Sequence, residues 1–144
     1  MTAQSEPIIR IHGIAGARSS CRVMGAAPFA LLSPERAGAI HGAMWFSSLI
    51  AEIRRKFPAA RFRAILDCRG RPSAALAAME LGIEAVLIDD GLSGEMQKRF
   101  ENLGAKTGCT ILTSLPDPAR IYQTGDDHLP DPELDRRLVA FLAL

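Results

Sequence analysis

The sequence has few of the residues that stabilise small secreted domains or bind zinc. Its three cysteines, Cys21, Cys68 and Cys109, lie far apart, are odd in number and form no Cys-x-x-Cys pair. This pattern excludes a disulfide framework and a cysteine-based zinc site.

Long apolar runs are also missing. No charge-free apolar run reaches the roughly 18 residues that a membrane span requires. Residues 1–7 lack the basic and apolar regions of a secretion signal, and we expect them to form a disordered tail. We therefore expect the protein in the cytoplasm, without a membrane partner.

The chain has almost no net charge. It has 17 Lys and Arg against 16 Asp and Glu, a net charge of +1, which argues against a nucleic-acid partner. The total hides an asymmetry, because residues 1–72 carry 11 basic and 4 acidic side chains while residues 73–144 carry 6 and 12. Fourteen of the 17 basic residues are arginines, whose planar guanidinium suits phosphate or carboxylate.

Two interpretations of this asymmetry stay open. The first is ordinary scatter together with solvated helix faces. The second is a group of arginines near one small anionic ligand. The arginines of that group would be Arg10, Arg18, Arg22, Arg69 and Arg71.

What the chain does have is the composition and pattern of an α/β domain. With 144 residues, 48% of them hydrophobic, it is long enough for one soluble globular domain with its own core. Apolar runs typical of buried parallel strands alternate with segments typical of helices. The predicted strands are residues 8–12, 29–32, 62–66, 85–88 and 110–113. The predicted helices are residues 34–57, 72–81, 94–106 and a last one from residue 131.

This alternation predicts a single α/β domain over residues 1–144, with about five mostly parallel strands joined by right-handed crossovers. Helix starts are indicated by a capping residue before an acidic first turn, at Ser33 and Ser93. Two stretches have no regular period. We interpret residues 13–27 as a long loop and residues 115–130 as a surface excursion.

The carboxyl ends of parallel strands meet at one edge of a sheet, where α/β domains place their ligands. The first polar residue at the end of each predicted strand, with arginines in the adjoining loops, therefore marks the candidate site. The strand-end residues are His12, Ser33, Asp67, Asp89 and Thr113, and the loop arginines are Arg18, Arg69 and Arg71. We predict that this edge binds an anion, with help from the amides of nearby helix starts. The alternative is that these residues only meet water or cap turns.

Two of the strand-end residues are carboxylates at neighbouring strand ends. Asp67 and Asp89 fit general acid–base chemistry or a divalent cation. Because no second ligand cluster accompanies them, we predict neither a metal nor a cofactor.

The segment from Asp67 to Ala75, Asp-Cys-Arg-Gly-Arg-Pro-Ser-Ala-Ala, places a cysteine between a buried strand and a helix start. The helix dipole and the neighbouring arginines are expected to lower the pKa of Cys68 and make it a nucleophile. The segment resembles the active loop of rhodanese-like domains, and the resemblance implies that Cys68 carries a persulfide. The candidate catalytic residues are Cys68, as the thiol nucleophile, and Asp67, as the acid–base carboxylate beside it. The alternative is that Cys68 is a small buried hydrophobic residue at a strand end.

The succession of strands and helices over residues 28–115 resembles consecutive units of a (βα)8 barrel. Five strands are too few to close a barrel, so the resemblance implies a half-barrel, with a Rossmann-like three-layer sheet as the alternative. Both leave open sheet edges. A half-barrel also exposes apolar surface, so we expect a homodimer.

The leading hypothesis from the sequence is that the protein binds a small anionic molecule, a phosphate or a carboxylate, at the carboxyl edge of the sheet. One alternative is a structural or self-associating module without catalysis. The other is rhodanese-like thiol chemistry at Cys68. The sequence leaves open whether the protein is an enzyme.

Overall fold

A computed structural model describes residues 6–126 and 128–143. It is a single α/β domain with one parallel sheet, which confirms the predicted fold class. The strands are β1 (Ile8–Arg10), β2 (Phe29–Leu32), β3 (Phe62–Asp67), β4 (Ala85–Leu87), β5 (Thr110–Leu112) and β6 (Ile121–Gln123). The helices are α1 (Ile14–Met24), α2 (Ala37–Ile40), α3 (Ala43–Lys56), α4 (Ser73–Glu80), α5 (Gly94–Thr107) and α6 (Asp131–Leu142), with a short 3-10 helix η1 (Pro118–Arg120).

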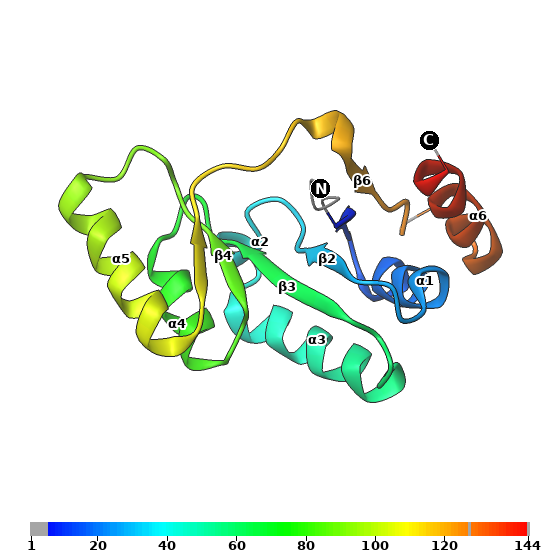
Figure 1. Cartoon of the computed structure of the whole chain (residues 1–144), viewed down its shortest axis with the longest axis horizontal. Helices are drawn as coiled ribbons and strands as arrows, with labels where there is room; N and C mark the ends of the chain where they lie inside the picture. The colour runs from blue at the N-terminus through cyan, green and yellow to red at the C-terminus, as the bar shows by residue number, and fades with distance from the viewer. Residues whose placement is uncertain (1–5, 127, 144) are drawn as a thin grey trace, which may run out of the picture.

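The strands lie in the order β5-β4-β3-β2-β1-β6, and every neighbouring pair is parallel. From β1 to β5 the order in the sheet follows the order in the chain. β6 departs from this progression, because it pairs with the other side of β1, at the opposite end of the sheet from β5. The β5–β6 connection therefore crosses from one end of the sheet to the other, along the top of Figure 1.

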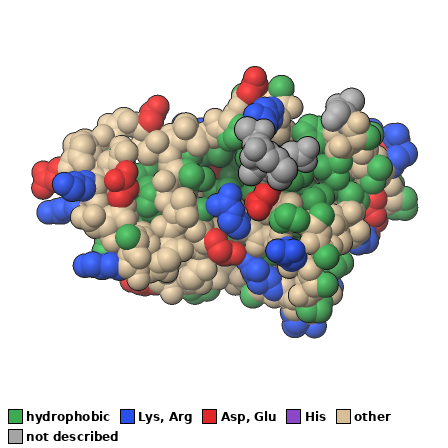
Figure 2. Space-filling model, in the orientation of Figure 1, with side chains coloured by type: hydrophobic (Ala, Val, Ile, Leu, Met, Phe, Trp, Pro, Cys, Tyr) green, Lys and Arg blue, Asp and Glu red, His purple; other side chains and the backbone are tan. Residues whose placement is uncertain are grey.

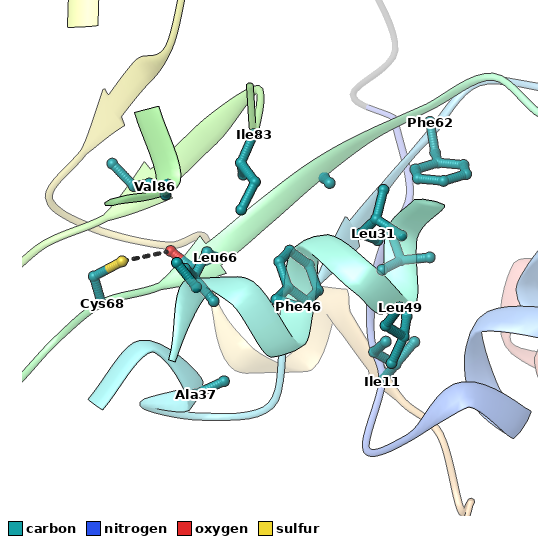
Figure 3. Close-up of a cluster of buried hydrophobic side chains, with 14 of the residues drawn as sticks. Ile11, Leu31, Ala37, Phe46, Leu49, Phe62, Leu66, Cys68, Ile83 and Val86 are labelled. Carbon is teal, nitrogen blue, oxygen red and sulfur yellow. Dashed lines mark hydrogen bonds between the residues drawn. The ribbon is translucent and has the colours of Figure 1, made fainter. Parts of the chain in front are cut away.

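Different parts of the chain pack against the two faces of the sheet. Side chains at alternate strand positions form two separate clusters, as the two-residue period of a strand requires. The larger cluster joins strand residues such as Ile9, Leu31 and Leu66 to residues of α1, α3, α4, α5 and α6, and Figure 3 shows part of it. The smaller cluster joins residues of all six strands to Leu115 of the β5–β6 connection. No helix residue of the described chain belongs to it. We call the two sides the helix face and the loop face.

Three predicted helices are confirmed with nearly the predicted bounds. They are α4, α5 and α6. The expected cap of α5 is also present, because Ser93 Oγ accepts a hydrogen bond from the backbone N–H of Met96 at 3.2 Å. Within the described residues, no helix combines the length and apolarity needed to cross a membrane.

The prediction that residues 13–27 form a loop is wrong, because they contain α1. The buried face of this helix lies between Gly16 and Cys21 and consists mostly of small and polar residues, which conceal its helical period. The buried hydroxyls have partners: Ser20 Oγ donates to the carbonyl oxygen of Gly16 at 2.8 Å, and Ser19 Oγ donates to Asp135 of α6 at 2.6 Å. The small residues thus allow α1 to lie close to its neighbours.

The predicted helix over residues 34–57 is interrupted. It divides into α2 and α3, with Gly42 between them at φ +89°, a conformation that glycine adopts without a side-chain clash. Ser33 does not cap this segment as expected. Its Oγ instead accepts a hydrogen bond from the backbone N–H of Asp67 at 2.9 Å, and so ties β2 to the end of β3.

Residues 115–130 are more than a surface excursion, because they contain η1 and the sixth strand, β6. The prediction of about five strands missed this one, because β6 has no fully buried side chain and lies in a tract rich in proline and acidic residues. Position 127 lies outside the described residues. In the register of β6 with β1, Gln123 is the partner of Arg10.

The predicted disordered tail is wrong for residues 6 and 7. The carbonyl oxygen of Pro7 accepts a hydrogen bond from the N–H of Ala30 at 2.9 Å, and Glu6 lies 3.7 Å from the guanidinium of Arg63. For residues 1–5 the prediction lies outside the described residues.

Candidate functional site

The alternation of side chains along the strands places three polar residues on the loop face, at its carboxyl edge. On β1, β3 and β6, the isoleucine that belongs to the smaller cluster is followed two positions later by a polar residue. Residues two apart in a strand point to the same face. The three polar residues are Arg10, Asp67 and Gln123.

A cleft of about 410 Å³ opens at this edge, a size within the range of about 300–1,000 Å³ that is typical of small-molecule sites. Its polar lining consists of Arg10, Glu35, Arg69, Asp90, Thr113, Ser114 and Gln123. Its apolar lining comes from the β5–β6 connection and β6, and consists of Leu115, Pro116, Pro118 and Ile121. The cleft therefore has the location at which parallel α/β sheets place ligands.

Asp67 joins the two arginines of the cleft. Arg69 donates two parallel hydrogen bonds to it, from Nε to Oδ1 at 3.0 Å and from Nη2 to Oδ2 at 2.7 Å. Arg10 Nη1 lies 3.5 Å from Asp67 Oδ2 and donates to the carbonyl oxygen of Ser33 at 3.2 Å. The Asp67 side chain is 0% exposed and that of Arg10 is 7% exposed. These residues therefore form a buried ion network, which reaches the surface where Arg69 Nη2 lies 3.8 Å from Glu35.

The network keeps all three groups charged at neutral pH. Burial by itself would raise the pKa of Asp67, but hydrogen bonds from Arg69 and from the backbone of Arg36 outweigh it and hold the pKa below its ordinary value. Burial lowers the pKa of Arg10, and the negative charge of Asp67 partly offsets this. The hydrogen bond to Asp67 raises the pKa of Arg69.

One edge of the Arg10 guanidinium has no partner in the part of the chain that the structure describes. Its Nη1 has the partners given above, whereas Nε and Nη2 have no hydrogen-bond partner among the described residues. Elsewhere in this protein the Nε–Nη2 edge is the one that binds a carboxylate, in Arg69 with Asp67 and in Arg22 with Asp135. The free edge of Arg10 is therefore suited to two parallel hydrogen bonds with a ligand carboxylate or phosphate.

The structure brings together only part of the predicted arginine group. Arg10 and Arg69 meet at Asp67. Arg18 lies on α1 and Arg71 is exposed in the loop before α4, and neither lines the cleft. Arg22, also on α1, pairs with Asp135 of α6. The other three arginines are separated from the cleft because α1 and the β3–α4 loop carry their side chains elsewhere.

The structure also brings only some of the five predicted strand-end residues to the cleft. Thr113 lines the cleft and Asp67 is the buried partner of its arginines. Ser33 and Asp89 bind backbone, the latter by accepting the N–H of Gly70 at 3.0 Å. His12 lines a separate hollow of about 220 Å³.

Asp126, from the loop after β6, shares the hollow at His12. This carboxylate accepts hydrogen bonds from the backbone N–H of His12 and of Gly16, in the first turn of α1. The side chain of His12 points back to β6, with Nε2 at 3.1 Å from Gln123 Oε1. A side chain of the protein itself therefore interacts with the free amides at the start of α1.

The expectation of a lowered pKa at Cys68 is wrong. Its thiol lies on the helix face, fully buried, and donates to the carbonyl oxygen of Leu66 at 3.7 Å, as Figure 3 shows. Burial, with the nearby charge of Asp67 and the thiol of Cys109, raises the pKa of Cys68 to about 12. Cys68 and Asp67 are adjacent in β3 and its extension, so they point to opposite faces. Cys68 does not line the cleft.

We expect Cys68 in the folded protein to alkylate slowly at neutral pH, with a rate that still rises beyond pH 10. An ordinary thiol reaches half of its maximal rate near pH 8.5, whereas the pKa of Cys68 is raised to about 12. The measurement is the rate of iodoacetamide labelling against pH, read by peptide mass spectrometry with the urea-unfolded protein as control. A half-point at or below 8.5 in the folded protein would instead favour the thiol hypothesis.

Several lining residues were not predicted from the sequence. Asp90 follows the predicted site residue Asp89, and Glu35 lies two positions after Ser33. Only the tertiary structure places both on the lining of the cleft. The residues of the β5–β6 connection and Gln123 were missed with β6 itself. Arg10, a member of the predicted arginine group, carried a further signal: it stands inside an otherwise apolar strand, and a buried charge in a core strand needs a partner or a function.

Among residues 6–126 and 128–143, no three His, Cys, Asp or Glu side chains are grouped so that they could hold a metal ion. The expected absence of a metal and a cofactor stays a prediction. Neither a protein-family model nor a curated protein matches the chain.

Proposed function

We propose that the protein binds a small organic anion, a carboxylate or a phosphate, in the cleft at the carboxyl edge of its sheet. The observation that carries the proposal is the Arg10 guanidinium, whose side chain is 7% exposed and whose Nε–Nη2 edge has no partner among the described residues. Desolvated arginines with a free edge bind anions strongly, because the competing water is largely removed.

The charge of the network supports this assignment. Two guanidinium groups surround the single buried carboxylate of Asp67, so this group has one positive charge in excess. Arg69 uses its own Nε–Nη2 edge on Asp67. The excess charge is therefore available chiefly at Arg10, and an anion there neutralises the buried groups, whereas Glu35 beside Arg69 is exposed to water.

The test is binding of a panel of organic acids and phosphate esters to three forms of the protein, measured by thermal shift and calorimetry. A ligand at about 100 times its Kd is expected to stabilise the wild-type fold by about 2.7 kcal/mol. Arg10→Met should weaken binding at least about tenfold, since a charge-assisted hydrogen bond is lost. Arg71→Met is the matched control, because it removes the same charge from an exposed position outside the cleft.

Two outcomes would count against this function. One is that no member of the panel stabilises the wild type. The other is that Arg10→Met and Arg71→Met weaken binding equally, which would indicate a general charge effect. Circular dichroism establishes that each variant is folded, and Arg10→Lys, which keeps the charge without the two-pronged edge, is the second test if Arg10→Met does not fold.

The other hypotheses from the sequence have less support. Thiol chemistry at Cys68 needs an accessible thiolate, which burial and the raised pKa disfavour. Self-association as a homodimer stays a prediction, and so do the cytoplasmic location and the absence of a nucleic-acid partner. The three cysteines are free thiols, as expected in a reducing compartment.

A further inference from the structure

We infer that the ligand is an amino acid with an apolar carbon skeleton, whose carboxylate binds Arg10 and whose ammonium group lies near Asp90. The inference rests on the proposed function, because it assigns the carboxylate to the same free edge of Arg10. It goes beyond that function by adding a cation to the ligand and by excluding phosphate esters as the preferred class.

The balance of charge around the cleft favours a zwitterion over a phosphate dianion. Arg10 and Arg69 are positive, whereas Asp67 behind them and Glu35 and Asp90 on the lining are negative. These five groups have a net charge of −1, so a phosphate dianion at Arg10 would bring the total to −3. A zwitterion adds no net charge. The mixture of signs extends over the surface in Figure 2, which carries acidic and basic side chains interspersed.

Some charged groups of the cleft are paired with one another and others are not. Arg69 is bound by Asp67 and lies 3.8 Å from Glu35, so these three neutralise much of each other's charge. Asp90 lines the cleft, is exposed, and makes no ion pair or hydrogen bond with the described residues. The two groups left for a ligand are therefore one cation edge, at Arg10, and one carboxylate, at Asp90.

The β5–β6 connection and β6 form an apolar wall of the cleft. Leu115 and Ile121 are half-buried, belong to the smaller apolar cluster and also line the cleft. Two prolines, Pro116 and Pro118, complete this wall. Proline has no backbone N–H, and none of these side chains can hydrogen-bond to a sugar hydroxyl. An apolar skeleton between or beside the two charged groups would bury surface against this wall.

The experiment compares matched ligand pairs that differ only in the ammonium group. The pairs are leucine with 4-methylpentanoate and 6-aminohexanoate with hexanoate, with phenyl phosphate as the phosphate ester, all measured by calorimetry at low salt. In at least one of the two pairs, the amino acid is expected to bind about three- to tenfold more tightly than its deaminated partner. Salt should reduce this preference because Asp90 is exposed. Asp90→Asn should abolish this preference while leaving the binding of the deaminated acid unchanged or tighter. Asp89→Asn is the matched control, since that residue is adjacent and does not line the cleft.

The outcomes separate this inference from the proposed function. If the deaminated acids or phenyl phosphate bind at least as tightly as the amino acids and depend on Arg10, the amino-acid assignment is wrong and anion binding stands. If the preference for an amino acid survives Asp90→Asn, the assignment of the ammonium to Asp90 is overturned. If no ligand in the set binds in an Arg10-dependent way, both proposals fail.

Discussion

Replacing Asp67 by Asn is expected to lower the free energy of unfolding at neutral pH by about 3–5 kcal/mol, the usual cost of removing one partner from a buried ion pair. The Asp67 side chain is 0% exposed and lies between Arg10 and Arg69. Asparagine has nearly the same shape but no charge, so Arg10 would remain buried without a counter-ion. Because small domains have a total stability of only about 5–15 kcal/mol, this variant should be among the least stable single substitutions.

The effect of Asp67→Asn on the free energy of unfolding is expected to depend on pH. The pKa of Asp67 is lower in the folded protein than its ordinary value, which is about 3.9 in an unfolded chain. Its contribution is therefore fully present above about pH 4 and is lost as the pH falls through the lower folded pKa. Urea unfolding should show a large difference between wild type and Asp67→Asn at pH 7 and a smaller one at pH 2, below the pKa of Asp67 in the unfolded chain.

Asp90→Asn is the control for this measurement, because it removes the same charge from an exposed residue without a protein partner. Its effect on unfolding should stay within about 0.5 kcal/mol. A loss below 1 kcal/mol for Asp67→Asn at pH 7, or an equal loss at both pH values, would show that the network does not stabilise the fold as described.

Replacing Gly104 by Ala is expected to destabilise the protein by about 1–3 kcal/mol, the usual cost of overpacking. A Cβ atom at this position of α5 would overlap the backbone carbonyl oxygen of Cys109 and would lie 2.9 Å from Ile111 Cγ1. The carbonyl belongs to the turn that joins α5 to β5, and it cannot move independently of the strand. The helix would therefore have to shift away from the edge of the sheet.

Gly94→Ala in the same helix is the matched control. A Cβ atom at Gly94 would meet no atom within 4 Å, so the substitution should be neutral or should stabilise by up to about 1 kcal/mol through the unfolded state. Helix propensity alone predicts that both substitutions stabilise. Thermal and urea unfolding of the two variants should give opposite signs or a clear difference, and equal effects would contradict the close approach of α5 to β5.

Much of the fold was predictable from local patterns. Strands β3 and β4 are apolar runs because both of their faces are covered, and α5 has a capping serine at its start. Failures came where the local signal is weak. The helix α1 buries small and polar side chains, and no side chain of β6 is fully buried, so both depend on neighbours that a linear pattern does not display.

The position of the candidate site was predictable from the sequence, but the residues that form it were not. The carboxyl edge of a parallel sheet follows from the strand pattern, and Arg69 and Thr113 do line the cleft there. The assignment of a nucleophile to Cys68 failed, although the alternation of β3 already implies that Asp67 and Cys68 point in opposite directions. Which of these two directions is the helix face depends on where the helices pack, and that is a property of the whole sheet.

The sequence by itself determined the α/β class, the parallel strands and the polar edge, because these follow from hydrophobic period and from where each apolar run ends. Only the tertiary structure decided that β6 returns to β1 and brings the apolar wall of the β5–β6 connection over the loop face. It also decided that Arg10 and Asp67, 57 positions apart, form one buried network. The physical reason is that burial and ion pairing depend on distances between segments remote in the chain, and no local pattern encodes those distances.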